Sequence, residues 1–129
     1  MAGPTINHLN LVVSDVLRSV KFYTENLGFT YVRYLNPRKA ILSYGGFDFF
    51  LEQAENVSPH PRFHFGILAE KDEVYRMIDR LRARSVKIVA GNNPNNLADV
   101  YVADRVRFVF YFEDPDGYLV EVYSHIGIA

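Results

Sequence analysis

The spacing of apolar residues predicts a strand, a helix and three further strands in the first half of the chain. Ile6 to Val13 is short, β-branched and apolar on both faces, which is typical of a buried strand. From Val16 to Leu27, apolar residues recur at helical spacing; Ser14 and Asp15 are N-cap candidates and Gly28 is a C-cap glycine. The strand-like runs that follow are 29–34, 39–43 and 47–53.

The same order recurs after a Pro-containing stretch at 56–61, which we interpret as a linker. The second copy is predicted to contain strands at 63–69, 86–89, 105–112 and 118–123 and a helix at 72–84. Its region 92–104 reads as an insertion, with a polar loop at 91–97 and a short strand around 100–102. The run from Asp114 to Gly117 is a turn signal. The sequence therefore predicts an α+β fold of two tandem βαβββ modules, at about 5–54 and 62–125, within one domain covering 1–129.

Composition narrows the classes of function. The chain has 129 residues, of which 49% are hydrophobic, and a net charge of −1 with no basic stripe, so we expect no nucleic-acid partner. Because there is no cysteine, disulfides and thiolate chemistry are excluded.

The first ten residues do not resemble a signal peptide, and no apolar run reaches the roughly 20 residues of a membrane span. We expect a cytoplasmic protein without a membrane partner. The aromatic content of 15% favours an aromatic-lined cavity.

Each predicted module contributes one histidine in its first strand and one carboxylate in its last strand. These residues are His8 with Glu52 and His64 with Glu121. If the modules are related by a pseudo-two-fold axis, the four side chains occupy equivalent positions in pairs. Two nitrogens and one or two carboxylates suit Ni, Co, Mn, Fe or Zn with open coordination positions. The pattern therefore indicates one divalent metal ion at the junction of the modules.

Each of these residues has a simpler interpretation. A single histidine in a strand is more often hydrogen-bonded in a core or placed at an edge, and a glutamate in a terminal strand usually lies on a solvated face. His60, in a Pro-rich loop, and His125, in the tail, are expected to be solvated. The metal interpretation therefore depends on the set of four residues.

Three sequence stretches resemble the vicinal oxygen chelate superfamily, which includes glyoxalase I, fosfomycin-resistance enzymes, bleomycin-resistance proteins and extradiol dioxygenases. They are 7–13, 22–29 and 113–118, the last followed by Glu121. The resemblance implies paired βαβββ modules whose sheets form a cup around a metal, and a homodimer. It also implies that His8, His64 and Glu121 are metal ligands, with Glu52 as the additional carboxylate ligand of glyoxalase I.

The residues resemble two different subfamilies, glyoxalase I and the fosfomycin-resistance enzymes. Asn56 matches an asparagine that helps to hold glutathione in glyoxalase I, but Val12 stands where an arginine would bind the glutathione carboxylate. Asn10 stands at the position of a threonine in fosfomycin-resistance enzymes. Their Lys-, Ser- and Arg-rich anion-binding segment corresponds here to 91–104, which is Asn-rich, so we do not expect a phosphonate substrate. Asn10 and Asn56 are the candidate substrate-binding residues.

The expected function is that of a divalent-metal-dependent lyase or isomerase of glyoxalase type. Its small-molecule substrate would chelate the metal through two vicinal oxygens, and Glu121 or Glu52 would transfer the proton. One alternative is a non-catalytic binding protein that confers resistance by sequestering an antibiotic-like molecule; the retained ligand set counts against it. A third is an Fe(II)-dependent dioxygenase, because two histidines and one carboxylate also form its facial triad. The substrate and the metal stay open at this point.

Overall fold

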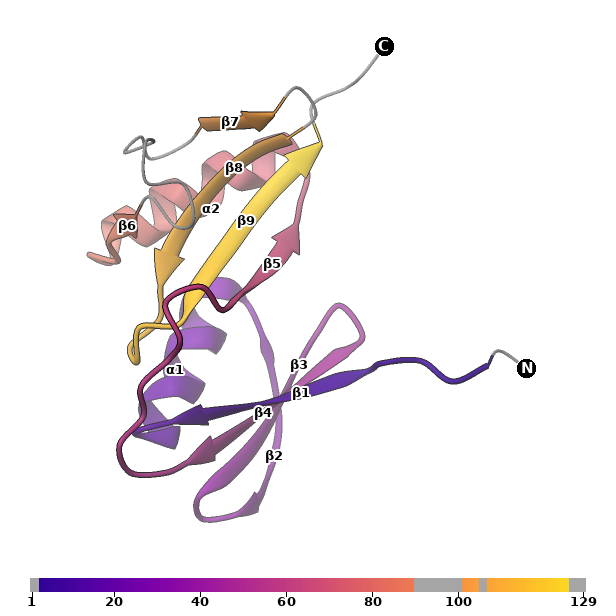
Figure 1. Ribbon diagram of the computed structural model, residues 1–129, viewed down its shortest axis with the longest axis vertical. Helices are drawn as coiled ribbons and strands as arrows, with labels where there is room; N and C mark the ends of the chain where they lie inside the picture. The colour runs from indigo at the N-terminus through magenta and orange to yellow at the C-terminus, as the bar shows by residue number, and fades with distance from the viewer. Residues whose placement is uncertain (1–2, 90–100, 105–106, 126–129) are drawn as a thin grey trace. The chain divides into compact units, whose positions relative to one another are not determined.

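The computed structural model describes residues 3–89, 101–104 and 107–125, and the chain divides into two compact units, 1–57 and 58–129 (Figure 1). The boundary falls inside the predicted linker. Each unit is described by itself below.

The first unit is a four-stranded mixed sheet with one helix. Its elements are β1 (His8–Val13), α1 (Val16–Leu27), β2 (Thr30–Asn36), β3 (Lys39–Tyr44) and β4 (Phe47–Gln53). The strand order is β1-β4-β3-β2; β1 runs parallel to β4, and the other pairs are antiparallel. Helix α1 packs against β3 and β4, and the sheet residues Leu11, Val13, Leu42 and Leu51 are at most 3% exposed.

Helix α1 begins and ends where the sequence predicts because both of its ends are capped. The Asp15 carboxylate accepts a hydrogen bond from the backbone N–H of Arg18 at 3.0 Å. At the other end, Gly28 adopts a left-handed φ of 76° and donates its N–H to the Tyr23 carbonyl. The predicted bounds of 16–27 are confirmed.

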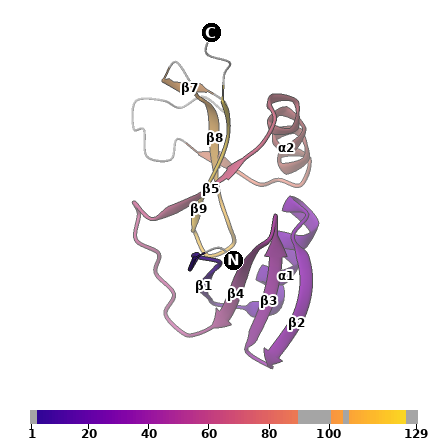
Figure 2. The same cartoon turned by 90° about the vertical axis from the view of Figure 1, so that its right-hand side faces the viewer.

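The second unit repeats the order, with one strand more. Its elements are β5 (His64–Leu68), α2 (Lys71–Ala83), β6 (Ile88–Val89), β7 (Tyr101–Asp104), β8 (Arg107–Glu113) and β9 (Leu119–His125). The sheet order is β5-β9-β8-β6, β7 also pairs with β8, and β5 runs parallel to β9. Figure 2 shows α2 on one side of this sheet, where it packs against β9. The helix buries Val74, Met77, Ile78 and Leu81.

The two βαβββ modules predicted from the sequence are confirmed, with small differences at element ends. Strand β6 begins at Ile88, later than the predicted residue 86. The reason is that Ser85 has a left-handed φ of 61° and Val86 donates its N–H to the Leu81 carbonyl, so that both residues finish helix α2. The short strand expected around 100–102 is present as β7, and the loop predicted at 91–97 lies outside the described residues.

The turn predicted between β8 and β9 is also confirmed. The Asp114 carboxylate accepts hydrogen bonds from the N–H groups of Asp116 and Tyr118, both at 2.9 Å, and Gly117 has a φ of 90°. Within the described ranges, neither helix has the length and apolar character that crossing a membrane requires.

Replacing Gly28 with alanine is expected to destabilise the fold by strain alone. A Cβ at this position meets no atom within 4 Å, so the cost is that of a left-handed L-residue, roughly 1–2 kcal/mol. Urea denaturation measures the change in the free energy of unfolding. The matched control is Gly3→Ala, where there is also open space and no left-handed φ. Equal stability of the two variants would contradict the capping role of Gly28.

Candidate functional site

In the first unit, the pairing of β1 with β4 decides which candidate residues are neighbours. His8 pairs with Asp48, Asn10 with Phe50, and Val12 with Glu52. These six residues share one face of the sheet, because side chains two apart in a strand point to the same side. This face is the open one: His8 and Asn10 are exposed and Phe50 and Glu52 are half-buried, whereas α1 packs against the sheet near the buried Leu51.

The imidazole of His8 has two contacts that orient it. Its Nδ1 lies 2.9 Å from Oδ1 of Asn7, and its ring stacks on Phe50 with centroids 4.8 Å apart and an interplanar angle of 25°. Because the Asn7 oxygen can only accept, this contact favours the neutral tautomer with the proton on Nδ1, in which Nε2 keeps its lone pair.

His64 is oriented in the same manner in the second unit. Its Nδ1 lies 3.3 Å from the backbone carbonyl oxygen of Arg62, which can only accept a hydrogen bond. This contact therefore favours the neutral tautomer with the proton on Nδ1. Histidines that bind metals usually donate the other ring N–H to such an oxygen, which fixes both tautomer and orientation.

Glu121 is a buried carboxylate on the same face of the second sheet as His64. It is only 6% exposed, and it pairs with Gly66, two residues beyond His64 on the same face. Its Oε2 accepts a 2.8 Å hydrogen bond from the Tyr111 hydroxyl. Its Oε1 lies over Gly66, where an added Cβ would be 3.0 Å away. Because Gly66 has no side chain, the Glu121 carboxylate can occupy this space.

Sequence reasoning did not assign a role to Tyr111 or Gly66. Strand alternation does place Gly66 on the face of His64. The turn at 114–117 places Tyr111 opposite Glu121, as the observed pairing confirms. Both signals are present in the sequence, but neither says that these residues hold the carboxylate.

The expectation that Glu52 and Glu121 occupy equivalent positions is wrong. Glu121 lies two residues beyond Leu119, the partner of His64, whereas Glu52 lies four residues beyond Asp48, the partner of His8. Four residues of strand span about 13 Å between Cα atoms, so Glu52 lies farther along the strands from the partner of His8 than Glu121 does from the partner of His64. Glu52 accepts a hydrogen bond from Nδ2 of Asn10 at 3.1 Å.

The two asparagines predicted to bind substrate differ in setting. Asn10 lies on the open face, where it holds Glu52. Asn56 is exposed after β4 and has a left-handed φ of 59°, a conformation that asparagine tolerates better than most residues. The turn alone therefore accounts for an asparagine at position 56. His60 is exposed, as predicted, and the side chain of His125 lies outside the described residues.

The candidate metal ligands are divided between the units. His8 and Glu52 belong to the first unit, and His64 and Glu121 to the second. In the part of the chain that the structure describes, no group of three or more His, Asp or Glu side chains is placed so as to hold a metal ion. Each unit thus contains one histidine and one glutamate of the four predicted metal ligands.

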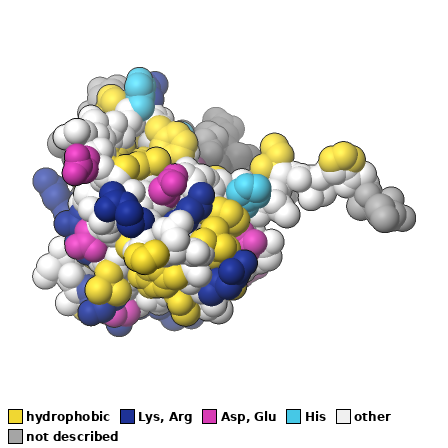
Figure 3. Space-filling model, turned by 90° about the horizontal axis from the view of Figure 1, so that it is seen from below, with side chains coloured by type: hydrophobic (Ala, Val, Ile, Leu, Met, Phe, Trp, Pro, Cys, Tyr) yellow, Lys and Arg dark blue, Asp and Glu magenta, His cyan; other side chains and the backbone are white. Residues whose placement is uncertain are grey.

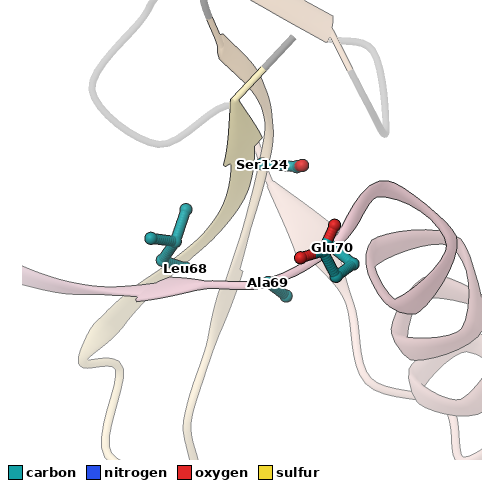
Figure 4. A pocket seen from close by; sticks show the side chains of 4 residues that line it. All are labelled: Leu68, Ala69, Glu70 and Ser124. Carbon is teal, nitrogen blue, oxygen red and sulfur yellow. The ribbon is translucent and has the colours of Figure 1, made fainter. Parts of the chain in front are cut away.

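A cavity of about 380 Å³ opens at the end of β5 in the second unit (Figure 4). The described residues that line it are Leu68, Ala69, Glu70 and Ser124, and none of these four is aromatic or a predicted site residue. Figure 3 shows a face on which basic and acidic side chains of described residues alternate among apolar ones, without a patch of one charge.

The glyoxalase/bleomycin resistance protein/dioxygenase superfamily model matches residues 5–122, nearly the whole chain. The chain belongs to this superfamily. Its members typically bind a divalent metal ion and small-molecule substrates, and they are often dimers.

Individual relatives are 25–30% identical to this superfamily member over the aligned residues. It is 30% identical over 128 residues to the glutathione transferase FosA of Serratia marcescens, covering 95% of this chain and 81% of the relative. It is 27% identical over 127 residues to the virulence protein STM3117 of Salmonella typhimurium, covering 94% and 84%. The solved structure of a possible glyoxalase from Bacillus cereus has a TM-score of 0.77 at 25% identity, covering 93% and 98%.

Removing the Tyr111 hydroxyl is expected to destabilise the second unit. In Tyr111→Phe, the buried Glu121 carboxylate loses a donor, which costs about 2 kcal/mol for a hydrogen bond to a charged group. Urea denaturation compares this variant with Tyr31→Phe, a control at a residue that is 49% exposed. A loss of stability no larger than that of the control would show that the hydrogen bond contributes little.

Proposed function

We propose that this protein is a divalent-metal-dependent enzyme of glyoxalase type, a lyase or isomerase, with His8, His64 and Glu121 as the metal ligands. Its substrate is a small molecule that presents two neighbouring oxygens to the metal. The observation that carries the proposal is the orientation of the ligands. Both histidines have Nδ1 at an acceptor oxygen, which makes Nε2 the ring nitrogen that would bind a metal, and the buried Glu121 lies two residues beyond Leu119, the strand partner of His64.

The donor set fits such an ion. Two imidazole nitrogens and one carboxylate suit Ni, Co, Zn, Mn or Fe, and three protein ligands leave positions for two substrate oxygens. A bound cation would add to the stabilisation of Glu121, because a carboxylate removed from water is costly unless charge or hydrogen bonds compensate it. The Tyr111 hydrogen bond supplies one part of that compensation.

When bound, the metal supplies Lewis acidity to the chelated oxygens of the substrate. The residues of the chain provide the remaining functions. Glu121 is the candidate for proton transfer: one oxygen is held by the Tyr111 hydroxyl, and the other lies over Gly66. On the open face of the first sheet, Asn10 holds Glu52, and we assign this pair to substrate contact.

A second candidate function is transfer of glutathione to an electrophilic substrate. It is favoured by the 30% identity with the glutathione transferase of Serratia marcescens. The two candidates differ in the bond that the glutathione sulfur forms. An isomerase of glyoxalase type converts a thiohemiacetal into a thioester, which hydroxylamine cleaves, whereas a transferase forms a thioether, which hydroxylamine does not cleave. Treating the product of metal-loaded protein with hydroxylamine therefore separates them.

Elemental analysis and metal titration test the proposal. The parent chain is expected to bind one divalent ion, and His8→Ala, His64→Ala and Glu121→Gln are each expected to weaken binding by more than ~100-fold, because loss of a mere supporting residue already costs 10–100-fold. His60→Ala is the matched control and is expected to bind as the parent does. A parent chain without metal affinity, or ligand variants that bind equally well, would overturn the proposal.

A further inference from the structure

In the first unit, the position equivalent to Glu121 is occupied by Phe50. The partner of His64 is Leu119, and two residues later in β9 comes Glu121. The partner of His8 is Asp48, and two residues later in β4 comes Phe50. The two units therefore present the same arrangement of strands, with a carboxylate beside one histidine and an aromatic ring beside the other.

The Phe50 ring contacts side chains from both neighbouring strands. His8, from β1, stacks on it with centroids 4.8 Å apart. Lys39, from β3, places its Nζ 5.5 Å from the ring centroid, although Lys39 pairs with the oppositely charged Glu52 in the register. A cation over an aromatic ring is favourable and restrains the ring. Phe50 is therefore contacted by side chains from β1 and β3, the two strands on either side of β4.

We infer that Phe50 is a positioning residue for His8. Because Phe50 stands where the second unit has Glu121, we also infer that the metal receives no second carboxylate ligand from this position. Only the second half of this inference, which concerns the metal, rests on the proposed function. Stacking sets the plane of the imidazole, and the Asn7 hydrogen bond sets its rotation, so that together they define the direction of Nε2. Three protein ligands then leave more of the metal's coordination sphere to the substrate.

The orienting role is tested without any metal. In the parent protein at alkaline pH, nitrogen–proton correlation spectra are expected to report His8 in its Nδ1–H tautomer. In Phe50→Leu the ring loses its stacking partner, and we expect a mixture of tautomers; in Phe50→Tyr the parent state is expected to return. Tyr31→Leu, which removes an exposed ring on β2, is the control. A parent-like His8 spectrum in Phe50→Leu would overturn the orienting role.

The effect on the metal is tested with Co(II), whose absorption reports coordination number. Loss of a stacked aromatic contact is expected to weaken Co(II) binding roughly 2- to 10-fold in Phe50→Leu. Phe50→Glu supplies a carboxylate at the position equivalent to Glu121, so it is expected to bind Co(II) more tightly and to lower the visible absorption as coordination increases. Leu35→Glu adds the same charge on exposed β2 and is expected to change neither property.

The outcomes separate the two proposals. If the parent chain binds no Co(II), the proposed function fails, while the tautomer measurement still decides the orienting role. If the parent binds Co(II) but Phe50→Glu alters neither affinity nor absorption, the second half of the inference is overturned and the proposed function stands. Circular dichroism verifies that each variant is folded, and Phe50→Asp, which places a shorter carboxylate at the same position, tests the second half of the inference if Phe50→Glu does not fold.

Discussion

The parallel pairing of the first and last strands in each unit is the constraint on which the rest of the site depends. Because side chains alternate along a strand, a shift of one residue would turn every candidate ligand to the opposite face, and a shift of two would give each histidine a different neighbour. The observed register places Glu121 beside Gly66 and near His64, and Phe50 beside Asn10 and near His8. The chemistry open to each unit follows from these neighbours.

Local signals predicted most of the fold, because they lie close together in the chain. Asp15 and Gly28 define both ends of α1, and Asp114 with Gly117 defines the turn before β9. The start of β6 was harder to predict, since a hydrogen bond from Val86 back to Leu81 extends the end of the helix over residues that have strand-like side chains. At Val86, this backbone hydrogen bond determines the structure, although the apolar pattern predicts a strand.

The candidate site was predicted in part, and the error has a physical cause. Alternation places Glu52 on the face of His8, as the structure has it, but the parallel partners β1 and β4 are joined through a helix and two other strands, so no turn sets their register. By contrast, Tyr111 and Glu121 lie symmetrically about one turn, so their pairing was accessible from the sequence. What the sequence does not contain is the space left by Gly66, because this depends on the distance between neighbouring strands.

Crystallography of the metal-loaded protein, with anomalous scattering to locate the ion, tests the central claim most directly. The account predicts one ion within about 2.0–2.2 Å of Nε2 of His8, Nε2 of His64 and a carboxylate oxygen of Glu121, with Phe50 against His8 and Glu52 outside the coordination sphere. An ion bound elsewhere, or held without His8 or Glu121, would contradict it.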